Sequence, residues 1–369
     1  MKIGILTYPL NNNYGCYMQS FALLTFLKER GYDVEYIFRR HDKPSIIYYL
    51  KYSVKSILKT ITTFRFNSIR YNYEYEYMIK KGQNMLVFFE TYIQPHTEII
   101  YTTRKLKKIC QKYDAIIVGS DQVWRAEILS NVEDYFLSFL SVSSSVKRIA
   151  YAASFGKSDP GYTRRQIKRC GRAISYFSDI SIREDAGVSI LKKYDWTCPE
   201  PHVVLDPTML LKKECYYSLI KKRKYKETIL GYILDQSNDK QRILKQVSEH
   251  FSVASCNFLE NVKKDDFIFP SIVSWLGMLA SSRFVVTDSF HGAVFSIILN
   301  KPFVVVVNER RGAARFETLL NKFNLYNRML NIENNVYDIL NNDINWEDVN
   351  NILNKEREKS INFLIESLK

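Results

Sequence analysis

The residue best placed for acid–base chemistry is His291, one of five histidines in the chain. It follows the pattern of a buried strand at 284–287 and lies two residues before a helical pattern at 293–299. A turn of this kind faces the edge where parallel sheets bind ligands, and the free amides of a helix start favour an anion. The pattern predicts a histidine that transfers a proton beside a bound anion. A histidine that only caps the helix is the alternative.

Arginines follow two other strand patterns. Arg183 comes directly after 180–182, and Arg310, Arg311 and Arg315 come after 303–307. A guanidinium offers paired donors in one plane, which suits phosphate and carboxylate groups. We therefore expect at least one of the clustered arginines to reach the pocket of His291, with solvated surface charge as the alternative for the others.

Three polar loops also follow predicted strands, at 11–15, 119–124 and 153–156. Asparagine, glycine and hydroxyl groups suit hydrogen bonding to a polar ligand, and a tryptophan suits stacking on a sugar. An ordinary turn at 11–15 and a helix cap at Asp121 are the alternatives. The acceptor-binding candidates are Asn13, Tyr14, Gly15, Asp121, Gln122, Trp124 and Ser154.

Strand and helix patterns alternate along the chain, which predicts two parallel-sheet α/β lobes, 1–205 and 206–369, with a cleft between them. The prolines at 199–207 mark the junction. The expected strands are 3–7, 34–38, 115–118, 148–153, 180–182, 203–205, 228–234, 252–256, 284–287 and 303–307. The expected helices are 16–30, 105–112, 164–177, one that follows 180–182, 240–250, 272–281, 293–299, 315–324 and 347–368. The Asn-rich stretch 331–351 reads as a surface loop that leads into the last of these helices.

One segment interrupts the alternation. Residues 43–73 contain six Lys or Arg and no acid, with apolar residues at helical spacing. The pattern is typical of a basic amphipathic helix, inserted at about 43–80 of the first lobe. Packing of its apolar stripe against that lobe and contact with a membrane surface or partner both remain open.

The composition is that of a basic globular protein. The chain has 369 residues, a formal charge of +14 and 46% hydrophobic residues, which excludes a disordered chain. The charge suits anionic partners without identifying them. We expect a cytoplasmic location, because the six cysteines are scattered and the sequence shows neither a signal-peptide pattern nor a run of 18 apolar residues. Neither a metal cluster nor a Walker, HExxH or GxSxG motif is present, so we expect no metal and no cofactor.

The loops together resemble the polysaccharide pyruvyl transferase family. The matching motifs, in order, are Asn13-Tyr14-Gly15, Gly119-Ser120-Asp121-Gln122-Val123-Trp124, Ala153-Ser154-Phe155-Gly156, Ser181-Ile182-Arg183-Glu184, Leu205-Asp206-Pro207-Thr208 and Thr287-Asp288-Ser289-Phe290-His291-Gly292. The resemblance implies a GT-B-like fold and transfer of pyruvyl from phosphoenolpyruvate to a sugar of a cell-surface or exopolysaccharide precursor. It covers neither 43–73 nor the last 45 residues.

The resemblance also implies roles for residues. His291 and Asp121 are the expected catalytic residues, and His291 would also bind the donor phosphate. The expected donor-binding residues are Arg183, Ser289, His291, Gly292, Arg310, Arg311 and Arg315. Some family members have an arginine at the position of Ser289, so one donor contact here is absent or comes from another arginine.

Two other functions compete with pyruvyl transfer. A glycosyltransferase that uses a nucleotide sugar would suit the same two-lobed scaffold, because a fold does not determine the donor. A nucleic-acid-binding protein would suit the charge, but the chain lacks a recognisable nucleic-acid module. The sequence does not decide which sugar is the acceptor or whether it is lipid-linked. It also leaves open a peripheral contact of 43–73 with the inner face of the membrane.

Overall fold

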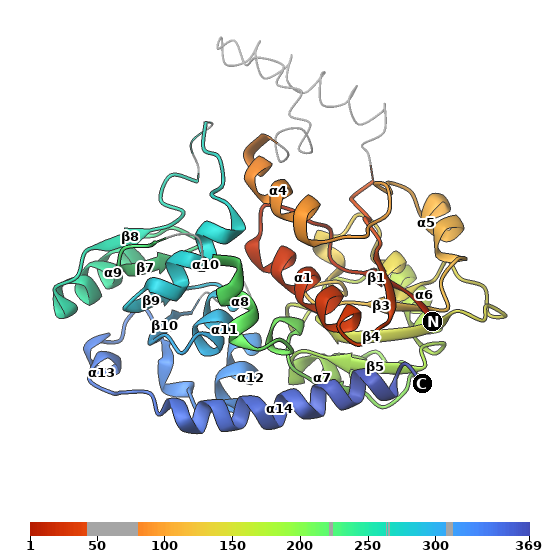
Figure 1. The fold of residues 1–369 in the computed structure, drawn as a ribbon. Coiled ribbons are helices and arrows are strands. Elements are labelled where there is room, and N and C mark those ends of the chain that lie inside the picture. The colour runs from red at the N-terminus through yellow and green to blue at the C-terminus, as the bar shows by residue number, and fades with distance from the viewer. Residues whose placement is uncertain (43–79, 221–223, 263, 265, 308–312) are drawn as a thin grey trace, which may run out of the picture.

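The chain forms two α/β lobes that lie side by side, each built on a parallel sheet (Figure 1). The computed structural model describes residues 1–42, 80–220, 224–262, 264, 266–307 and 313–369. The basic segment 43–73 and almost all of the predicted insertion therefore lie outside the described residues, as do Arg310 and Arg311. The predicted fold of two parallel-sheet lobes is confirmed.

The first lobe has a six-stranded sheet in the order β2-β1-β3-β4-β5-β6, and every neighbouring pair is parallel. Strands buried along their length, such as β3, require cover on both faces of the sheet. The strands are β1 (Lys2–Leu6), β2 (Asp33–Tyr36), β3 (Ala115–Val118), β4 (Lys147–Ala153), β5 (Asp179–Ile182) and β6 (His202–Val203). The helices are α1 (Tyr14–Lys28), α4 (Gln83–Tyr92), α5 (Thr103–Cys110), α6 (Arg164–Ile174) and α7 (Asp185–Lys193), with 3-10 turns at Ala126–Ile128 and Val132–Phe136.

The second lobe has a five-stranded parallel sheet in the order β11-β10-β9-β7-β8. Its strands are β7 (Ile229–Tyr232), β8 (Ser255–Asn257), β9 (Phe284–Thr287), β10 (Phe303–Val306) and β11 (Met329–Leu330). Its helices are α8 (Lys213–Ile220), α9 (Asn238–Phe251), α10 (Ile272–Ser281), α11 (Phe290–Ile298), α12 (Ala314–Lys322), α13 (Tyr337–Leu340) and α14 (Trp346–Glu366), with 3-10 turns at Pro207–Met209 and Tyr326–Arg328.

Most predicted elements are present within a few residues of their expected bounds. The loop predicted ahead of the C-terminal helix is the exception, because it contains the short helix α13, whereas α14 begins at Trp346, close to the predicted start at 347. Helices α4, α8 and α13 and strand β11 were not predicted. Within the described residues, no helix combines the length and apolar character that crossing a membrane requires.

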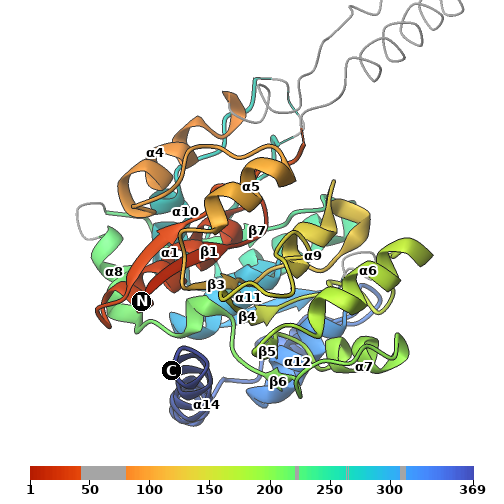
Figure 2. The same cartoon turned by 90° about the vertical axis from the view of Figure 1, so that its right-hand side faces the viewer.

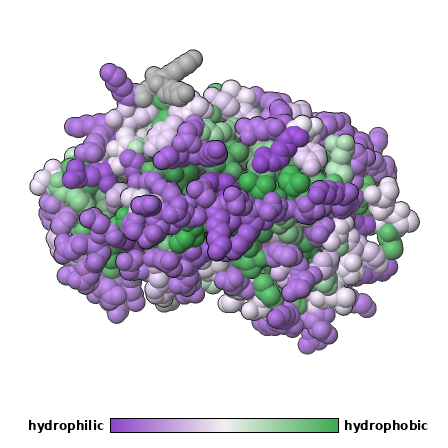
Figure 3. All heavy atoms as spheres, turned by 60° about the horizontal axis from the view of Figure 1, so that its bottom comes forward, coloured by the Kyte–Doolittle hydropathy of each residue, from purple (hydrophilic) through white to green (hydrophobic). Residues whose placement is uncertain are grey.

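The last helix, α14, runs along both lobes (Figure 1). From its C-terminal half, the Ser360 hydroxyl accepts the amide of Leu205 at 2.9 Å, and Arg357 Nε donates to the Met209 carbonyl at 2.7 Å. Figure 3 shows this face of the molecule, where hydrophilic side chains predominate and hydrophobic atoms appear in separate groups. Helix α14 therefore continues the second lobe and also fastens it to the first.

Aromatic packing joins the two lobes on the other side of the junction. Tyr14, at the start of α1, stacks on Trp275 of α10 with ring centroids 5.3 Å apart and planes inclined by 22°. Its hydroxyl donates to the carbonyl of Pro270 at 2.8 Å. The same hydrophobic cluster includes buried residues of both sheets, such as Ile5 and Val285. The lobes therefore share an apolar interface beside the ends of α1 and α10.

Candidate active site

His291 is presented by the turn between β9 and α11. The Ser289 hydroxyl caps α11 by accepting the amide of Gly292 at 3.4 Å, and the Thr287 hydroxyl accepts the amide of Ser289 at 3.0 Å. A Cβ on Gly292 would lie 2.3 Å from Thr287 Oγ1, so the tight turn requires glycine. Ser289 and Gly292 thus shape the helix start that holds His291, and direct contact of either with a donor stays a prediction.

The imidazole of His291 lies between the two lobes. Only 4% of His291 is exposed. A Cβ on Gly15 of α1 would lie 2.0 Å from His291 Nδ1, which means that the ring packs directly over this glycine. On its other side, Nε2 lies 3.5 Å from Asp206 Oδ2. Nε2 has no hydrogen-bond partner among the described residues, which is unusual for a buried polar atom.

Asp206 occupies the turn that follows β6. Its Oδ1 accepts the amide and hydroxyl of Thr208 at 3.0 and 2.7 Å, and its Oδ2 accepts Arg183 Nη1 at 2.9 Å and the Ser120 hydroxyl at 3.1 Å. Burial alone would raise the pKa of Asp206, but His291, Arg183 and the Thr208 hydrogen bond outweigh burial and hold that pKa far below its usual range. Asp206 is therefore an ionised carboxylate fixed beside the imidazole.

Arg183 follows β5, as predicted, and its guanidinium is surrounded by carboxylates. Besides the bond to Asp206, its Nη2 lies 3.4 Å from Asp121 Oδ1, and its Nε lies 3.7 Å from Glu184 Oε2. Neither Nε of Arg183 nor Oε2 of Glu184 has a hydrogen-bond partner among the described residues. The guanidinium also lies 4.3 Å from the ring centre of Phe290. Two of its three nitrogens thus hold carboxylates, so its predicted role in donor binding would rest mainly on Nε.

Asp121 follows β3 in a left-handed backbone conformation, with φ of 69°. Non-glycine residues adopt this conformation rarely, and it is often found at functional sites. Burial would raise the pKa of Asp121, but the charges of Arg183, His291 and Arg315 lower it below the usual value. The Cys16 thiol donates to Asp121 Oδ2 at 3.2 Å, and burial raises the pKa of that thiol. Cys16 is therefore a packed, protonated thiol and not a nucleophile.

A second buried arginine, Arg315 of α12, completes the cluster. Its guanidinium lies 5.8 Å from the ring centre of Phe290, the ring that Arg183 also contacts. Burial, and next the charge of Arg183, lower the pKa of Arg315 to about 10. The prediction that one of the clustered arginines reaches the site of His291 is therefore consistent with Arg315.

Three of the predicted acceptor-binding residues belong to the core. Trp124 is fully buried, stacks on Phe136 with ring centroids 5.0 Å apart, and donates its Nε1 hydrogen to the Tyr135 carbonyl at 3.0 Å. Tyr14 is the interlobe aromatic described above. Ser154 is fully buried and donates to Glu184 Oε1 at 2.6 Å. All three have packing or hydrogen-bonding roles inside the protein, and their contact with an acceptor stays a prediction.

The other predicted acceptor residues have local contacts. Asn13 caps α1 by accepting the amide of Gly15 at 3.0 Å, and Gly15 provides the space for the imidazole of His291. Gln122 accepts a hydrogen bond from Arg125 Nη1 at 2.7 Å. Contact of these residues with an acceptor stays a prediction.

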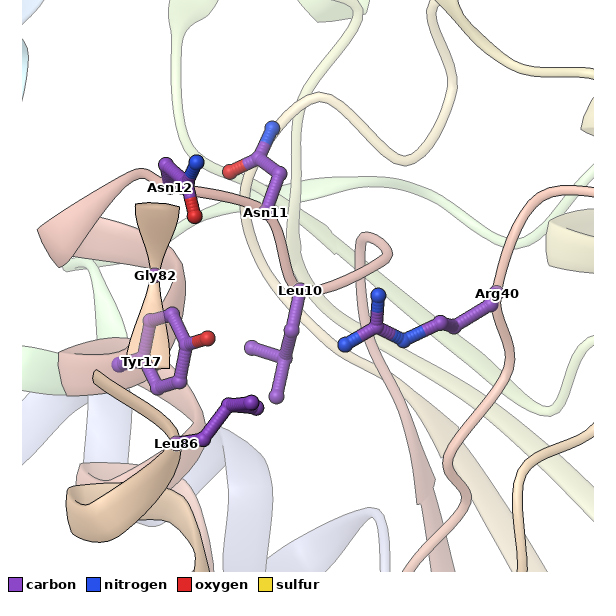
Figure 4. A pocket seen from close by; sticks show the side chains of 7 residues that line it. All are labelled: Leu10, Asn11, Asn12, Tyr17, Arg40, Gly82 and Leu86. Atoms are coloured by element: carbon purple, nitrogen blue, oxygen red, sulfur yellow. The ribbon is translucent and has the colours of Figure 1, made fainter. Parts of the chain in front are cut away.

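The loop before α1 does line a hollow (Figure 4). Asn11 and Asn12 lie at its rim, and Tyr17, Arg40 and Leu86 are also among its lining residues. The Oδ1 atom of Asn11 is buried and has no hydrogen-bond partner among the described residues. The amide oxygen of Asn11, two residues before the predicted Asn13, could therefore accept a hydrogen bond from a ligand.

Sequence reasoning missed three members of the cluster: Asp206, Glu184 and Ser120. All three occur in the strand-end motifs, and that location was the available signal. Asp288, by contrast, supports the fold: it accepts Lys240 Nζ at 2.6 Å and the amides of Leu234 and Asp235 at 2.6 and 3.0 Å. In the part of the chain that the structure describes, no group of three or more His, Cys, Asp or Glu is arranged to hold a metal ion.

Two parallel-sheet α/β lobes packed against each other have the architecture of a GT-B fold, and the buried His–Asp–Arg cluster lies at their junction. A family model described as polysaccharide pyruvyl transferase matches residues 13–310. The chain therefore belongs to the polysaccharide pyruvyl transferase family.

Solved structures support the fold. A putative UDP-N-acetylglucosamine 2-epimerase from Listeria monocytogenes is similar over 96% of this chain and 90% of its own, with 10% identity and a TM-score of 0.50. A UDP-GlcNAc 2-epimerase from Neisseria meningitidis, bound to UDP-GlcNAc, is similar over 100% of this chain and 99% of its own, with 11% identity and a TM-score of 0.50. No curated protein matched the chain.

Proposed function

We propose that this chain transfers the pyruvyl group of phosphoenolpyruvate to a sugar of a bacterial cell-surface or exopolysaccharide precursor in the cytoplasm. The products would be a cyclic ketal across two sugar hydroxyls and inorganic phosphate. Membership of the family supports the transferase class. The observation that carries the proposal is the buried His291 Nε2, which is without a hydrogen-bond partner among the described residues and is held at a helix start between Gly15 and Asp206.

The start of α11 and two buried arginines would offer positive charge to a small anionic donor. The first amides of α11 have no acceptors within the helix, and the positive end of the helix dipole lies at the turn that carries His291. Arg315 and the Nε edge of Arg183 would add positive charge for the phosphate and carboxylate. Ser289 and Gly292 shape the turn from which these groups act. Arg310 and Arg311 remain candidates from the sequence.

The reaction balances without a cofactor or metal. A proton from His291 adds to the methylene carbon of phosphoenolpyruvate, which leaves an oxocarbenium-like centre at the adjacent carbon. One sugar hydroxyl adds to that centre and loses its proton. Phosphate then leaves with its bonding electron pair, and the second hydroxyl closes the ring and loses its proton. Of the two protons released, one replaces the proton supplied by His291 and the other leaves with phosphate.

The two buried aspartates would have different tasks from the histidine. A carboxylate whose pKa is lowered is a weak base, so Asp121 and Asp206 suit electrostatic stabilisation better than proton abstraction. We assign Asp121 to stabilisation of the cationic centre. Asp206 positions the imidazole of His291, because it lies 3.5 Å from Nε2 and is itself held by Arg183 and Thr208.

The acceptor would enter beside the start of α1. The hollow lined by Asn11 and Asn12 has a volume of about 10 Å³, room for a single hydroxyl, so the sugar ring would stay outside it and use the amide groups at its rim. A lipid-linked acceptor would suit a contact of the basic segment 43–73 with the membrane surface. This segment lies outside the described residues, so the contact rests on its sequence pattern alone.

The test is incubation of the protein with phosphoenolpyruvate and a panel of sugar acceptors, followed by mass spectrometry for the ketal and a phosphate assay. We expect phosphate release that depends on the acceptor, and we expect His291→Ala to abolish it. His250→Ala, at the end of helix α9, is the matched control and should retain full activity. Turnover of a nucleotide sugar, with none of phosphoenolpyruvate, would instead establish the competing glycosyltransferase function.

A further inference from the structure

A second hollow lies in the first lobe, far from His291. It occupies about 320 Å³ between the start of β4 and helix α6, and its lining includes Ser141, Val142, Arg148, Arg169, Arg172 and Tyr176. Arg148 is near the first residue of β4, whereas Ala153, the last residue of that strand, leads to the catalytic cluster. Helix α6 lies on the side of the first lobe that faces away from the second lobe (Figures 1 and 2). The hollow therefore lies at the amino ends of the strands, and the candidate active site lies at their carboxyl ends.

Arg148 carries a buried charge into this hollow without a carboxylate to balance it. The residue is only 3% exposed. Its Nη2 donates to the Ser141 carbonyl at 2.6 Å, and its guanidinium lies 5.2 Å from the ring centre of Tyr176. Among the described residues no Asp or Glu forms an ion pair with it, and burial lowers the pKa of Arg148. An uncompensated buried cation is costly, so this arrangement points to a counter-ion that enters from solvent.

Two further arginines add to the positive charge. Arg169 and Arg172 are three residues apart on α6 and therefore share one face of the helix. Arg169 lies 3.5 Å from Glu133 Oε1, and Arg172 has no ion-pair partner in the described ranges. Three guanidinium groups thus face one carboxylate, which leaves a net charge of about +2 at the hollow. Guanidinium groups in such number are typical of phosphate recognition.

The rim of the hollow is also apolar. Val142 is 59% exposed and Tyr176 is 37% exposed, and both are among the few large hydrophobic side chains that the described part of the chain leaves in solvent. A free inorganic anion would not use these surfaces. We propose that the hollow binds a phosphate or diphosphate group that carries an apolar substituent, with Arg148 and Arg172 on the anion and Val142 and Tyr176 on the substituent. This proposal does not depend on the function proposed above.

The test compares binding of dodecyl phosphate, below its micelle concentration, with binding of inorganic phosphate by calorimetry. We expect dodecyl phosphate to bind at least tenfold more tightly. We also expect Arg148→Met and Arg172→Gln each to weaken its binding at least tenfold. Arg165→Gln is the matched control, because Arg165 is an exposed cation of the same helix that does not line the hollow. Equal losses in all three variants, or no loss in the first two, would overturn the proposal.

Two further measurements sharpen the result. In phosphate-free buffer the Tm of Arg148→Met should equal or exceed that of the wild type, because the variant removes an uncompensated buried charge. A marked fall in Tm would show that the protein itself balances this charge, and the proposal would then be wrong. Sedimentation with phosphatidylglycerol–phosphatidylcholine vesicles identifies the source of the ligand. Loss of vesicle binding in Arg172→Gln indicates a lipid headgroup, and unchanged vesicle binding indicates a soluble phosphate ester.

Discussion

Gly15 provides the space that His291 occupies, and a single methyl group there tests the geometry of the site. A Cβ on Gly15 would lie 2.0 Å from His291 Nδ1 and 2.3 Å from Cγ, whereas real Cβ contacts stay above 3.0 Å. The ring must therefore move by at least about 1 Å in Gly15→Ala. Since His291 is 4% exposed and packed on both sides, it can move only if α11 shifts or the lobes separate.

The expected loss follows from this displacement. A misplacement of about 1 Å in a catalytic constellation costs roughly 100-fold in rate, which corresponds to about 2.7 kcal/mol. Relieving the clash should lower the free energy of unfolding by about 1–3 kcal/mol, the usual cost of overpacking a core, and the higher helix propensity of alanine within α1 offsets up to about 1 kcal/mol of that loss. We therefore expect acceptor-dependent phosphate release to fall about 100-fold while the thermal unfolding of the variant stays cooperative.

A matched control separates a local effect on His291 from a general effect of crowding. Gly277→Ala in α10 would place a Cβ 2.1 Å from Tyr225 Cε2, a comparable clash in a helix that does not carry the histidine. This variant should keep near wild-type turnover. Turnover of Gly15→Ala within threefold of the wild type, or an equal loss in both variants, would refute the reasoning. Calorimetric titration with phosphoenolpyruvate gives a second readout that needs no acceptor.

Other perturbations test the electrostatics of the buried cluster, the role of Trp124 and the dependence of stability on pH. Asp206→Asn keeps the shape of the side chain but removes its charge beside His291, so kcat should fall about 100-fold with little change in KM, as measured by initial rates. Trp124→Phe should lower the Tm by thermal scanning and leave the KM for the acceptor unchanged, because Trp124 is a core residue. Asp121 and Asp206 have lowered pKa values in the folded protein, so their stabilisation is present above about pH 4 and is lost as the pH falls further. Burial raises the pKa of Tyr36 to about 12, so its stabilisation is present below about pH 10 and is lost as the pH rises toward 12. The Tm should therefore be highest between about pH 5 and 9, and its acid decline should be shallower in Asp206→Asn.

Much of the fold was predictable because its strands are buried. Runs such as 115–118 and 303–306 are apolar throughout, which is typical of a parallel sheet covered on both faces. Crossover helices between them then imply neighbouring parallel strands. The short elements were not predictable in this way. Strand β11 has two residues and α13 has four, which is too few for a periodic pattern to be recognised.

The candidate site was predictable only in part. The position of His291 after a buried strand was informative, since strand ends of both sheets meet at the junction of the lobes. The partners of each side chain were not, because they come from distant segments: Gly15 and His291 meet only when the lobes pack. Trp124 shows where the sequence is ambiguous. An aromatic residue that follows a strand suits a sugar platform and a core position equally well, and only packing distinguishes the two.

The charge balance of the cluster explains why the donor residues are harder to assign than the histidine. Three carboxylates, those of Asp121, Glu184 and Asp206, face two guanidinium groups, those of Arg183 and Arg315. These groups alone carry a net charge of −1, which repels a phosphate that is itself anionic. A donor with phosphate and carboxylate groups therefore needs more positive charge than these side chains supply. The amides at the start of α11 would provide part of it, and the need for the remainder makes Arg310 and Arg311, which follow β10 in the sequence, the most important donor candidates still to be tested.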